Sequence, residues 1–560
     1  MKFKVQLFLF FTCLFFIHCS NKDIKEGYKN GMVVSANSLA SQVGIDILKN
    51  GGNAFDAAIG VQFALSVVYP NAGNIGGGGF VVYRLNDGSV GSLDFREKAP
   101  RKATRNMYLD DNNEVYIEKS KFGHLASGIP GSVDGMVKLH EKFGSLDWKN
   151  LLEPSIKLSK NGFKLTKNQA ISLNGVKESF LKLNDSSISL INKNEWKEND
   201  LLVQNNLYKT LERIKNDKRA GFYSGETAQL LLNEMNQGNG IFTLEDLDNY
   251  SSIWREPIIG NYKNHKIISI GPPSSGGIAL VQMLNGAEKL NVNKYEHNSK
   301  DYIHVISEIE SRVYADRATY LGDPDFFEVP SNTLISDKYL QNKFSTIDLN
   351  KKTPSSDIKE GQITMNETEE TTHFSIVDKF GNAVSITTTI NGSYGSKVVV
   401  DGAGFLLNNE MDDFSIKPGF PNMFGLTGGE ANAIEGNKRM LSSMTPTIIE
   451  KEGELFMVLG TPGGSTIITS VFQTILNVID FNMNMQEAVD SKKFHHQWSP
   501  DVIVIEKNTI KDDIKDNLIK MGHKFDETPS IGRMDCILVN ESSKLEGGAD
   551  KRGDDIAIGF

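Results

Sequence analysis

Residues 371–390 read TTHFSIVDKFGNAVSITTTI, two alternating runs of apolar and polar residues joined by a cluster of turn residues. The first run is His373–Val377, the turn cluster is Asp378–Asn382, and the second run is Ala383–Ile390. Alternation with a period of two is typical of a strand, and two such runs around turn residues predict a β-hairpin. A hairpin that turns about Phe380 places residue 371 opposite residue 389. We therefore expect two threonines to face each other where the hairpin opens.

A threonine hydroxyl is a weak nucleophile unless a base lies beside it. One solution makes the threonine N-terminal, so that its own α-amine, with a pKa of about 7.7–8.0, is the base. This solution requires cleavage of the bond between Glu370 and Thr371. Residues 350–370 are polar and predict an exposed linker in front of that bond. Spacing alone does not decide whether Thr371 is such a nucleophile, because most threonine pairs are ordinary strand residues.

The composition is that of a folded globular protein. The chain has 560 residues, of which 39% are hydrophobic and 23% charged, with a net charge of −10. An acidic chain whose charges are mixed along its length lacks the clustered basic residues that are typical of nucleic-acid binding. The length suits either several domains or one large α/β unit.

The N-terminus predicts export. Lys2 and Lys4 precede an apolar run, Val5–Ile17, which is too short to span a bilayer comfortably and is typical of a secretory signal. The run ends at Cys19, so residues 1–19 resemble a bacterial lipoprotein signal whose cysteine is acylated, although residues 16–18 are larger than usual there. We expect a periplasmic or envelope protein with a lipid anchor on the membrane. The alternative is an ordinary cleaved signal peptide with an incidental cysteine.

One further cysteine, Cys536, lies outside the leader. With Cys13 in the signal and Cys19 lipidated, the mature chain has no partner for a disulfide. Cys536 stands in an apolar run, which predicts a buried thiol.

The first hundred residues predict alternating helices and strands. Strands are expected at Met32–Ser35, Phe80–Tyr83 and Ser92–Phe95, and helices at Ala40–Lys49 and Ala54–Val68. Asn53 and Asp56 stand where helix caps belong. Residues 130–345 are expected to be mainly helical.

The hairpin belongs to a series of motifs. In chain order they are GGNAFDAA (51–58), GGGGF (76–80), DFRE (94–97), PPSSGG (272–277), YLGDPD (320–325), the stretch 371–395, LLNNEMDDF (406–414), LSSMTP (441–446) and GTPGGS (460–465). Together they resemble the γ-glutamyltranspeptidase family over nearly all of the mature chain. The resemblance implies an α/β (α+β) fold, the four-layer αββα sandwich of the N-terminal nucleophile hydrolases. Two autoprocessed fragments, 20–370 and 371–560, would interlock as one domain and form a heterodimer.

The resemblance also implies roles for the catalytic residues. Thr371 would cleave the chain at Glu370–Thr371 and then act as the nucleophile, and Thr389 would hydrogen-bond its hydroxyl. Gly463 and Gly464 would offer backbone N–H groups to the oxyanion of acyl transfer. Without the family, a plain strand threonine and a Pro-Gly turn would be the simpler interpretations.

A γ-glutamyl group carries a free α-carboxylate and a free α-ammonium, and a selective site must bind both. A guanidinium grips a carboxylate with two hydrogen bonds. By resemblance, Arg96, Ser442 and Ser443 would hold the carboxylate, while Asn391, Glu410 and Asp413 would hold the ammonium. Any one of these residues alone would more often be a surface charge or a turn residue.

Phe424 marks a departure from the family. Many members carry a tyrosine at the corresponding position, where it closes over the site as a lid and bonds the asparagine that matches Asn391. Phenylalanine can cover the site but cannot make that bond.

The implied activity is that of an autoprocessing γ-glutamyltransferase and glutathione hydrolase. Its donors would be glutathione and other γ-glutamyl compounds, its acceptors water, amino acids or dipeptides, and it would need no cofactor or metal. His495 and His496 lack the spacing of a metal-ligand pair, and His373 is expected to be structural. Two alternatives remain: an acylase of the same family that acts on a glutaryl-type amide, and a non-catalytic ligand-binding lipoprotein.

Overall fold

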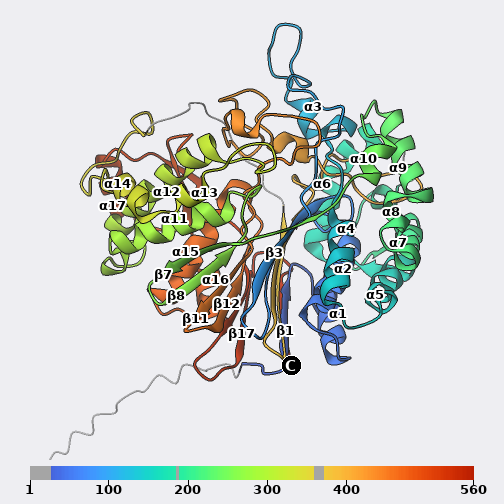
Figure 1. The fold of residues 1–560 in the computed structure, drawn as a ribbon, viewed down its shortest axis with the longest axis horizontal. Helices are drawn as coiled ribbons and strands as arrows, with labels where there is room; N and C mark the ends of the chain where they lie inside the picture. The colour runs from blue at the N-terminus through green and yellow to red at the C-terminus, as the bar shows by residue number, and fades with distance from the viewer. Residues whose placement is uncertain (1–26, 185–187, 359–370) are drawn as a thin grey trace, which may run out of the picture.

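The computed structural model describes residues 27–184, 188–358 and 371–560. The predicted leader with Cys19, and Glu370 with most of the predicted linker, lie outside these residues. The described chain forms two central sheets that face each other, with helices on the outer side of each (Figure 1). This is the four-layer αββα arrangement expected from the sequence.

The seven-stranded sheet has the order β18-β1-β9-β10-β2-β3-β6. Its strands are β18 (Ile556–Gly559), β1 (Gly31–Ser35), β9 (Thr372–Asp378), β10 (Ala383–Thr389), β2 (Gly78–Arg84), β3 (Val90–Asp94) and β6 (Ile253–Arg255). All neighbouring strands in it are antiparallel. Strands from both sides of residue 371 alternate here, so neither part of the chain could complete the sheet alone.

The six-stranded sheet has the order β17-β16-β12-β11-β8-β7. Its strands are β17 (Leu545–Ala549), β16 (Asp535–Val539), β12 (Glu454–Leu459), β11 (Thr447–Lys451), β8 (His265–Ser269) and β7 (Ile258–Tyr262). Two small sheets contain β13 (Phe494–His495), β14 (Ile503–Glu506) and β15 (Phe525–Thr528), and β4 (Phe163–Lys164) and β5 (Leu201–Leu202).

The helices separate into two groups along the chain (Figure 1). The first group comprises α1 (Ser38–Lys49), α2 (Ala54–Val68), α3 (Glu118–Lys121), α4 (Ser132–Phe143), α5 (Trp148–Asn161), α6 (Lys167–Leu183), α7 (Asn205–Asp217), α8 (Ala220–Tyr223), α9 (Gly225–Gln237) and α10 (Leu244–Asp248). The second comprises α11 (Gly276–Lys289), α12 (Lys300–Tyr320), α13 (Ser331–Leu334), α14 (Asp337–Phe344), α15 (Ile467–Ile479), α16 (Met485–Asp490) and α17 (Asp512–Lys520). Helices of the first group pack on the seven-stranded sheet and helices of the second on the six-stranded sheet.

Alternation along the strands builds the layers. Met32 and Val34 of β1 face the six-stranded sheet, whereas Val33 faces the helices of the first group. Every residue of α2 is buried, as expected for a helix that is apolar on all sides. Asn53 and Asp56 form the capping box at its start, which confirms the predicted caps.

The predicted hairpin consists of β9 and β10. Its register pairs Val377 with Ala383 and Thr372 with Thr388, which confirms the turn about Phe380. One carboxylate oxygen of Asp378 accepts the backbone N–H of Phe380 at 2.9 Å, and the other accepts the N–H of Ala54 at 3.0 Å. The turn is therefore tied to the first residue of α2, deep in the first helical layer.

The segment 130–345 is mainly helical, as expected, and it also contributes β4 to β8, short strands of two to five residues. Another expectation was wrong in part. The start of the predicted linker is only partly exposed: Lys351, Pro354, Ser356 and Asp357 are exposed, but Lys352 and Ser355 are not. Lys352 and Ser355 are 8% and 9% exposed, since the carboxylate of Asp501 binds the ammonium of Lys352 and the hydroxyl of Ser355. The distant partner that buries them could not be seen from local polarity.

Cys536 lies in β16 as a buried free thiol, as predicted. Its burial raises the pKa of the thiol well above the ordinary value. Within the ranges that the structure describes, no helix combines the length and the apolar character needed to cross a bilayer.

Candidate active site

The hairpin brings Thr371 and Thr389 together. Their Oγ1 atoms lie 3.5 Å apart, at the outer limit of a hydrogen bond, and Thr371 is only 5% exposed. The Oγ1 of Thr389 also accepts the backbone N–H of Asn391 at 2.7 Å. A hydroxyl has a single proton, so Thr389, once it accepts from Asn391, can direct that proton toward Thr371.

His373 lies on the same face of β9, two residues beyond Thr371. Its Nδ1 is 2.9 Å from the hydroxyl of Thr387 and its Nε2 is 3.1 Å from the hydroxyl of Ser375. Burial lowers the pKa of His373 to about 3, so the ring is neutral. Both ring nitrogens are engaged by these neighbours, and a Cβ at residue 460 would clash with the ring, which leaves Gly460 the residue that fits. The geometry makes His373 a packed structural residue.

Gly463 and Gly464 form the turn that leads into α15. Gly464 has a φ of 48°, and a Cβ there would lie 2.5 Å from the ring of Phe424. Glycine therefore lets Phe424 approach the backbone at this point. Backbone N–H groups that precede a helix are suited to negative charge.

The predicted residues converge on one cavity. Its volume is about 20 Å³, room for about one water molecule. Its lining includes Thr371, Thr389, Gly464, Arg96, Asn391, Glu410, Asp413, Ser442, Ser443 and Phe424. Of the predicted site residues within the described ranges, Gly463 alone is not in its lining, although it is bonded to Gly464. A γ-glutamyl group does not fit this cavity without movement of its walls.

Three apolar residues in the lining escaped the sequence argument: Leu426, Met444 and Ile467. Met444 stands inside the LSSMTP motif and Ile467 begins α15. An apolar side chain carries no group that takes part in the chemistry, so the sequence did not single these residues out. Only Met444 stands in a motif that contains predicted site residues, LSSMTP.

Arg96 is the charged centre of the cavity. Its guanidinium lies 2.5 Å from a carboxylate oxygen of Glu410 and 2.5 Å from one of Asp413, with Glu97 at 3.5 Å. Burial disfavours the cation, but Glu410, Glu97 and Asp413 outweigh it and raise the pKa of Arg96. Burial also raises the pKa of Glu97 to about 8, against the influence of Arg96. Burial raises the pKa values of Glu410 and Asp413 as well, against the influence of Arg96. One cation thus faces three carboxyl groups whose ionised forms an ammonium ligand would stabilise.

The serine pair closes the cavity beside Arg96. The guanidinium of Arg96 donates to the backbone oxygen of Met440 at 3.3 Å, just before the pair. Ser442 Oγ accepts the backbone N–H of Met444 at 3.1 Å, and Ser443 Oγ accepts from Arg317 at 3.0 Å. Each hydroxyl is engaged as an acceptor, so each can offer its proton to a carboxylate.

Asn391 and Phe424 form the opposite wall. The side-chain amide of Asn391 donates to the backbone oxygen of Asn409 at 3.0 Å and lies 3.6 Å from the sulfur of Met423. Phe424 is 3% exposed, and its backbone oxygen accepts from Gln497 at 3.3 Å. The ring of Phe424 packs over Gly464, and the thioether of Met423 lies beside the amide of Asn391.

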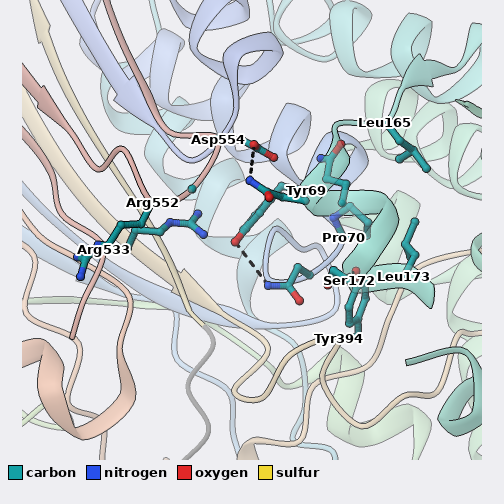
Figure 2. A pocket seen from close by; sticks show the side chains of 13 residues that line it. Tyr69, Pro70, Leu165, Ser172, Leu173, Tyr394, Arg533, Arg552 and Asp554 are labelled. Atoms are coloured by element: carbon teal, nitrogen blue, oxygen red, sulfur yellow. Dashed lines mark hydrogen bonds between the residues drawn. The ribbon is translucent and has the colours of Figure 1, made fainter. Parts of the chain in front are cut away.

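A second cavity, of about 180 Å³, lies elsewhere (Figure 2). Its lining includes Tyr69, Leu165, Ser172, Tyr394, Arg533 and Asp554, and none of the predicted site residues. The backbone N–H of Tyr394 donates to the oxygen of Asn71 at 2.8 Å on its wall. The larger cavity holds neither the threonine pair nor the charged residues around Arg96, so the chemistry of the lining favours the smaller cavity as the active site.

The adjacent histidines bond to different partners. His495 contacts the hydroxyl of Thr469 and the side chain of Gln497, each at 2.9 Å, and His496 lies 3.3 Å from the carboxylate of Asp501. Among the described residues, no group of three or more histidines, cysteines and acids has the arrangement of a metal site.

Comparison with known proteins agrees with the site. A family model described as gamma-glutamyltranspeptidase matches residues 40–560. The chain is 44% identical to the glutathione hydrolase proenzyme of Escherichia coli, covering 95% of this chain and 92% of that protein. It is 37% identical to the glutathione hydrolase proenzyme of Bacillus subtilis, with coverage of 95% and 92%.

Solved structures give the same result. The γ-glutamyltranspeptidase of Helicobacter pylori is 44% identical, with a TM-score of 0.57, over 60% of this chain and 97% of that chain. A cephalosporin acylase from Bacillus halodurans has a TM-score of 0.81 over 95% of this chain and 96% of its own, at 24% identity, which establishes a shared fold. With its sequence, its four layers and its threonine-centred cavity in agreement, the chain belongs to the gamma-glutamyltranspeptidase family.

Proposed function

We propose that this chain is an autoprocessing γ-glutamyltransferase and glutathione hydrolase. The observation that carries the proposal is a single cavity that holds Thr371 against Thr389 and also holds Arg96, Asp413 and the serine pair. The similar proteins from Escherichia coli and Bacillus subtilis bear the name glutathione hydrolase proenzyme, which supports both the activity and the cleavage.

Cleavage would begin with attack of the Thr371 hydroxyl on the carbonyl carbon of Glu370. The peptide C–N bond breaks, the nitrogen takes up the proton and becomes the free α-amine, and an ester joins the two fragments. Water then hydrolyses the ester to a carboxylate on Glu370 and a hydroxyl on Thr371. In the single chain this nitrogen is an amide and cannot act as a base, so cleavage creates the general base.

The sheet topology keeps the fragments together after cleavage. Strands β9 and β10 of the fragment 371–560 lie between β1 and β2 of the fragment 20–370. The last strand, β18, pairs with the other side of β1. In the six-stranded sheet, β11 of the second fragment pairs with β8 of the first. Separation would break these four ladders of backbone hydrogen bonds, so the product of cleavage is a stable heterodimer.

Turnover uses the same hydroxyl. The α-amine of Thr371 accepts the hydroxyl proton, and the oxygen attacks the γ-amide carbon. Negative charge develops on the carbonyl oxygen beside the N–H groups of Gly463 and Gly464, which stabilise it. The amine leaves with the proton, and the γ-glutamyl ester passes to water, an amino acid or a dipeptide. Every group used belongs to the chain, the substrate or water.

The charges of the cavity select the γ-glutamyl group. Its ammonium would stabilise the ionised forms of Glu410 and Asp413, whose pKa values burial raises, and its carboxylate would contact Arg96 and the serine hydroxyls. A glutaryl group has no ammonium, so it would not provide this stabilisation. This argues against the acylase alternative, and the likeness to the Bacillus halodurans acylase extends to the fold alone. A non-catalytic binding protein would not need a threonine pair beside the substrate site.

We also propose that the protein is exported to the bacterial envelope and anchored by lipid on Cys19. The support is the basic start, the short apolar run and the cysteine that ends it.

The first prediction is self-cleavage. The purified wild-type chain should run as two fragments, and N-terminal sequencing of the smaller should begin at Thr371. Thr371→Ala should stay a single chain because it has no attacking oxygen. Thr372→Val is the matched control, since the buried hydroxyl of Thr372 has no hydrogen-bond partner in the structure, and this variant should still be cleaved. An active wild-type enzyme that remains uncut would refute the mechanism.

The second prediction concerns the ammonium site. Asp413→Asn keeps the shape of the side chain but removes its charge, and should lower kcat/KM for a γ-glutamyl anilide by an amount equivalent to about 2–5 kcal/mol. Self-cleavage should be largely intact. Asp413 is a better target than Arg96, whose removal would leave three buried carboxyl groups without their cation.

Asp412→Asn is the control, because Asp412 neighbours Asp413 but does not line the cavity. Burial raises the pKa of Asp412 to about 6, which leaves it largely ionised at neutral pH, and its oxygens accept from the hydroxyl of Ser120 and the backbone N–H of Met423, neither of which lines the cavity. It should cost much less activity. Near-normal efficiency of Asp413→Asn on glutathione would show that the ammonium binds elsewhere.

The third prediction concerns the lid. Phe424 lacks the hydroxyl that would hold a tyrosine lid to Asn391, a bond worth about 0.5–1.5 kcal/mol. The lid should therefore open readily and admit water to the acyl-enzyme. Phe424→Tyr should raise the ratio of transfer to hydrolysis at a fixed acceptor concentration, and Phe424→Leu should not. An unchanged ratio in the tyrosine variant would mean that Phe424 only packs.

The fourth prediction concerns the anchor. Labelled fatty acid should be incorporated into the wild-type protein, and the protein should sediment with membranes. Cys19→Ala should lose the label, whereas Cys13→Ala, which changes the other leader cysteine, should keep it. A Cys19→Ala protein that still carries the label would place the anchor at another residue.

A further inference from the structure

A second arginine lies directly behind the serine pair. Arg317 is on α12, is 5% exposed and does not line the cavity. Its Nε donates to the hydroxyl of Ser275 at 3.0 Å, and its Nη2 donates to the hydroxyl of Ser443 at 3.0 Å. The hydroxyl of Ser275 in turn donates to the backbone oxygen of Ser442 at 2.7 Å. One guanidinium thus supports both serines from the side away from the substrate.

These contacts fix the direction of the Ser443 proton. A serine hydroxyl carries one proton and two lone pairs. Because the guanidinium of Arg317 has only donors, Ser443 must accept from it, and its own proton is left for another acceptor. The substrate carboxylate expected beside Arg96 is such an acceptor. A hydrogen bond from a cation also polarises the hydroxyl and makes it a stronger donor.

The charge of Arg317 points to the same ligand. Over the described residues, no carboxylate lies within 4.0 Å of its guanidinium, whereas Arg312, on the same helix, is 2.7 Å from Glu308. Burial lowers the pKa of Arg317, with Tyr314 and Asp413 acting against that effect from a distance. A buried cation without a close counter-charge is unfavourable. A bound carboxylate on the far side of Ser443 would supply the missing negative charge.

We propose that Arg317 is a positioning residue for the α-carboxylate of the γ-glutamyl group, acting through the hydroxyl of Ser443. This inference rests on the proposed function. Arg317 precedes the cleavage point and Ser443 follows it, so the carboxylate site is assembled from both fragments. Ser275, which also precedes that point, holds the backbone of Ser442 through its carbonyl oxygen.

Two substrates separate this role from a general structural one. The first is a γ-glutamyl anilide, and the second is the 4-aminobutanoyl anilide, which lacks the α-carboxylate. Arg317→Met should lower kcat/KM for the first by about 10- to 100-fold, mainly through KM, as expected when a hydrogen bond to a charged group is lost. The preference for the first substrate over the second should fall by a similar factor. Arg317→Lys keeps the charge but not the two guanidinium donors that bind Ser275 and Ser443. Its loss of kcat/KM should be intermediate between those of wild type and Arg317→Met.

A double-mutant cycle tests the path through Ser443. If Arg317 acts through this hydroxyl, Arg317→Met combined with Ser443→Ala should lose little more than the larger single change. Arg312→Lys is the matched control for a conservative change at a buried arginine of α12, and it should keep the wild-type preference. Arg317→Lys replaces Arg317→Met in the cycle if the methionine variant does not mature.

The outcomes distinguish failure of the Arg317 role from failure of the proposed function. Equal losses on both substrates, or losses that multiply in the double variant, would overturn the role of Arg317. Failure of the proposed function would show itself earlier, in a wild-type enzyme that releases no aniline or has no preference for the substrate with the α-carboxylate.

Discussion

The pairing of β9 with β10 is the constraint on which the rest of the site depends. It sets Thr371 opposite Thr389 at one end of the hairpin, while Asp378 ties the other end to α2. A shift of one residue would turn every side chain of β9 to the opposite face and remove Thr371 from the cavity. The neighbours β1 and β2 hold the hairpin on both sides, so a slip would have to break the whole seven-stranded sheet.

Around this fixed point, hydroxyl groups are oriented by the N–H groups that bind them. Thr389 accepts from a backbone N–H, Ser442 accepts from another, and Ser443 accepts from Arg317. Each is thereby prepared to donate its proton into the cavity before any substrate arrives. Such preorganisation removes the need to reorient dipoles during the reaction. The ion pairs of Arg96 with Glu410 and Asp413 place groups of both charge types in the cavity, as the proposed binding of a zwitterion requires.

Much of this arrangement could be predicted from the sequence. The hairpin register followed from residue spacing, and the capping residues of α2 from Asn53 and Asp56. The substrate-site residues were collected by motif resemblance, because Arg96 lies hundreds of residues before Asn391 and Asp413 and no local pattern joins them. Their convergence on one cavity agrees with that grouping, while their roles stay predictions.

The features that could not be predicted from the sequence depend on contacts between residues far apart in the chain. The strands β6 to β8 are too short for a clear period, and although β7 pairs with β8 next to it, β6 and β8 also pair with β3 and β11, far along the chain. Lys352 and Ser355 were expected to be exposed because they stand in a polar segment, but they are buried against Asp501. Arg317 sits in an ordinary helical stretch, and its significance comes from facing Ser443. Such long-range pairings are outside the reach of local periodicity and composition.

The central claim is that Thr371 becomes an N-terminal nucleophile that carries the γ-glutamyl group. The most direct measurement is mass spectrometry of the enzyme quenched in acid during turnover of a γ-glutamyl donor, followed by peptide mapping. The account predicts one added glutamyl unit on a peptide that begins at Thr371. An adduct on any other residue, or on a chain still uncut before Thr371, would contradict it.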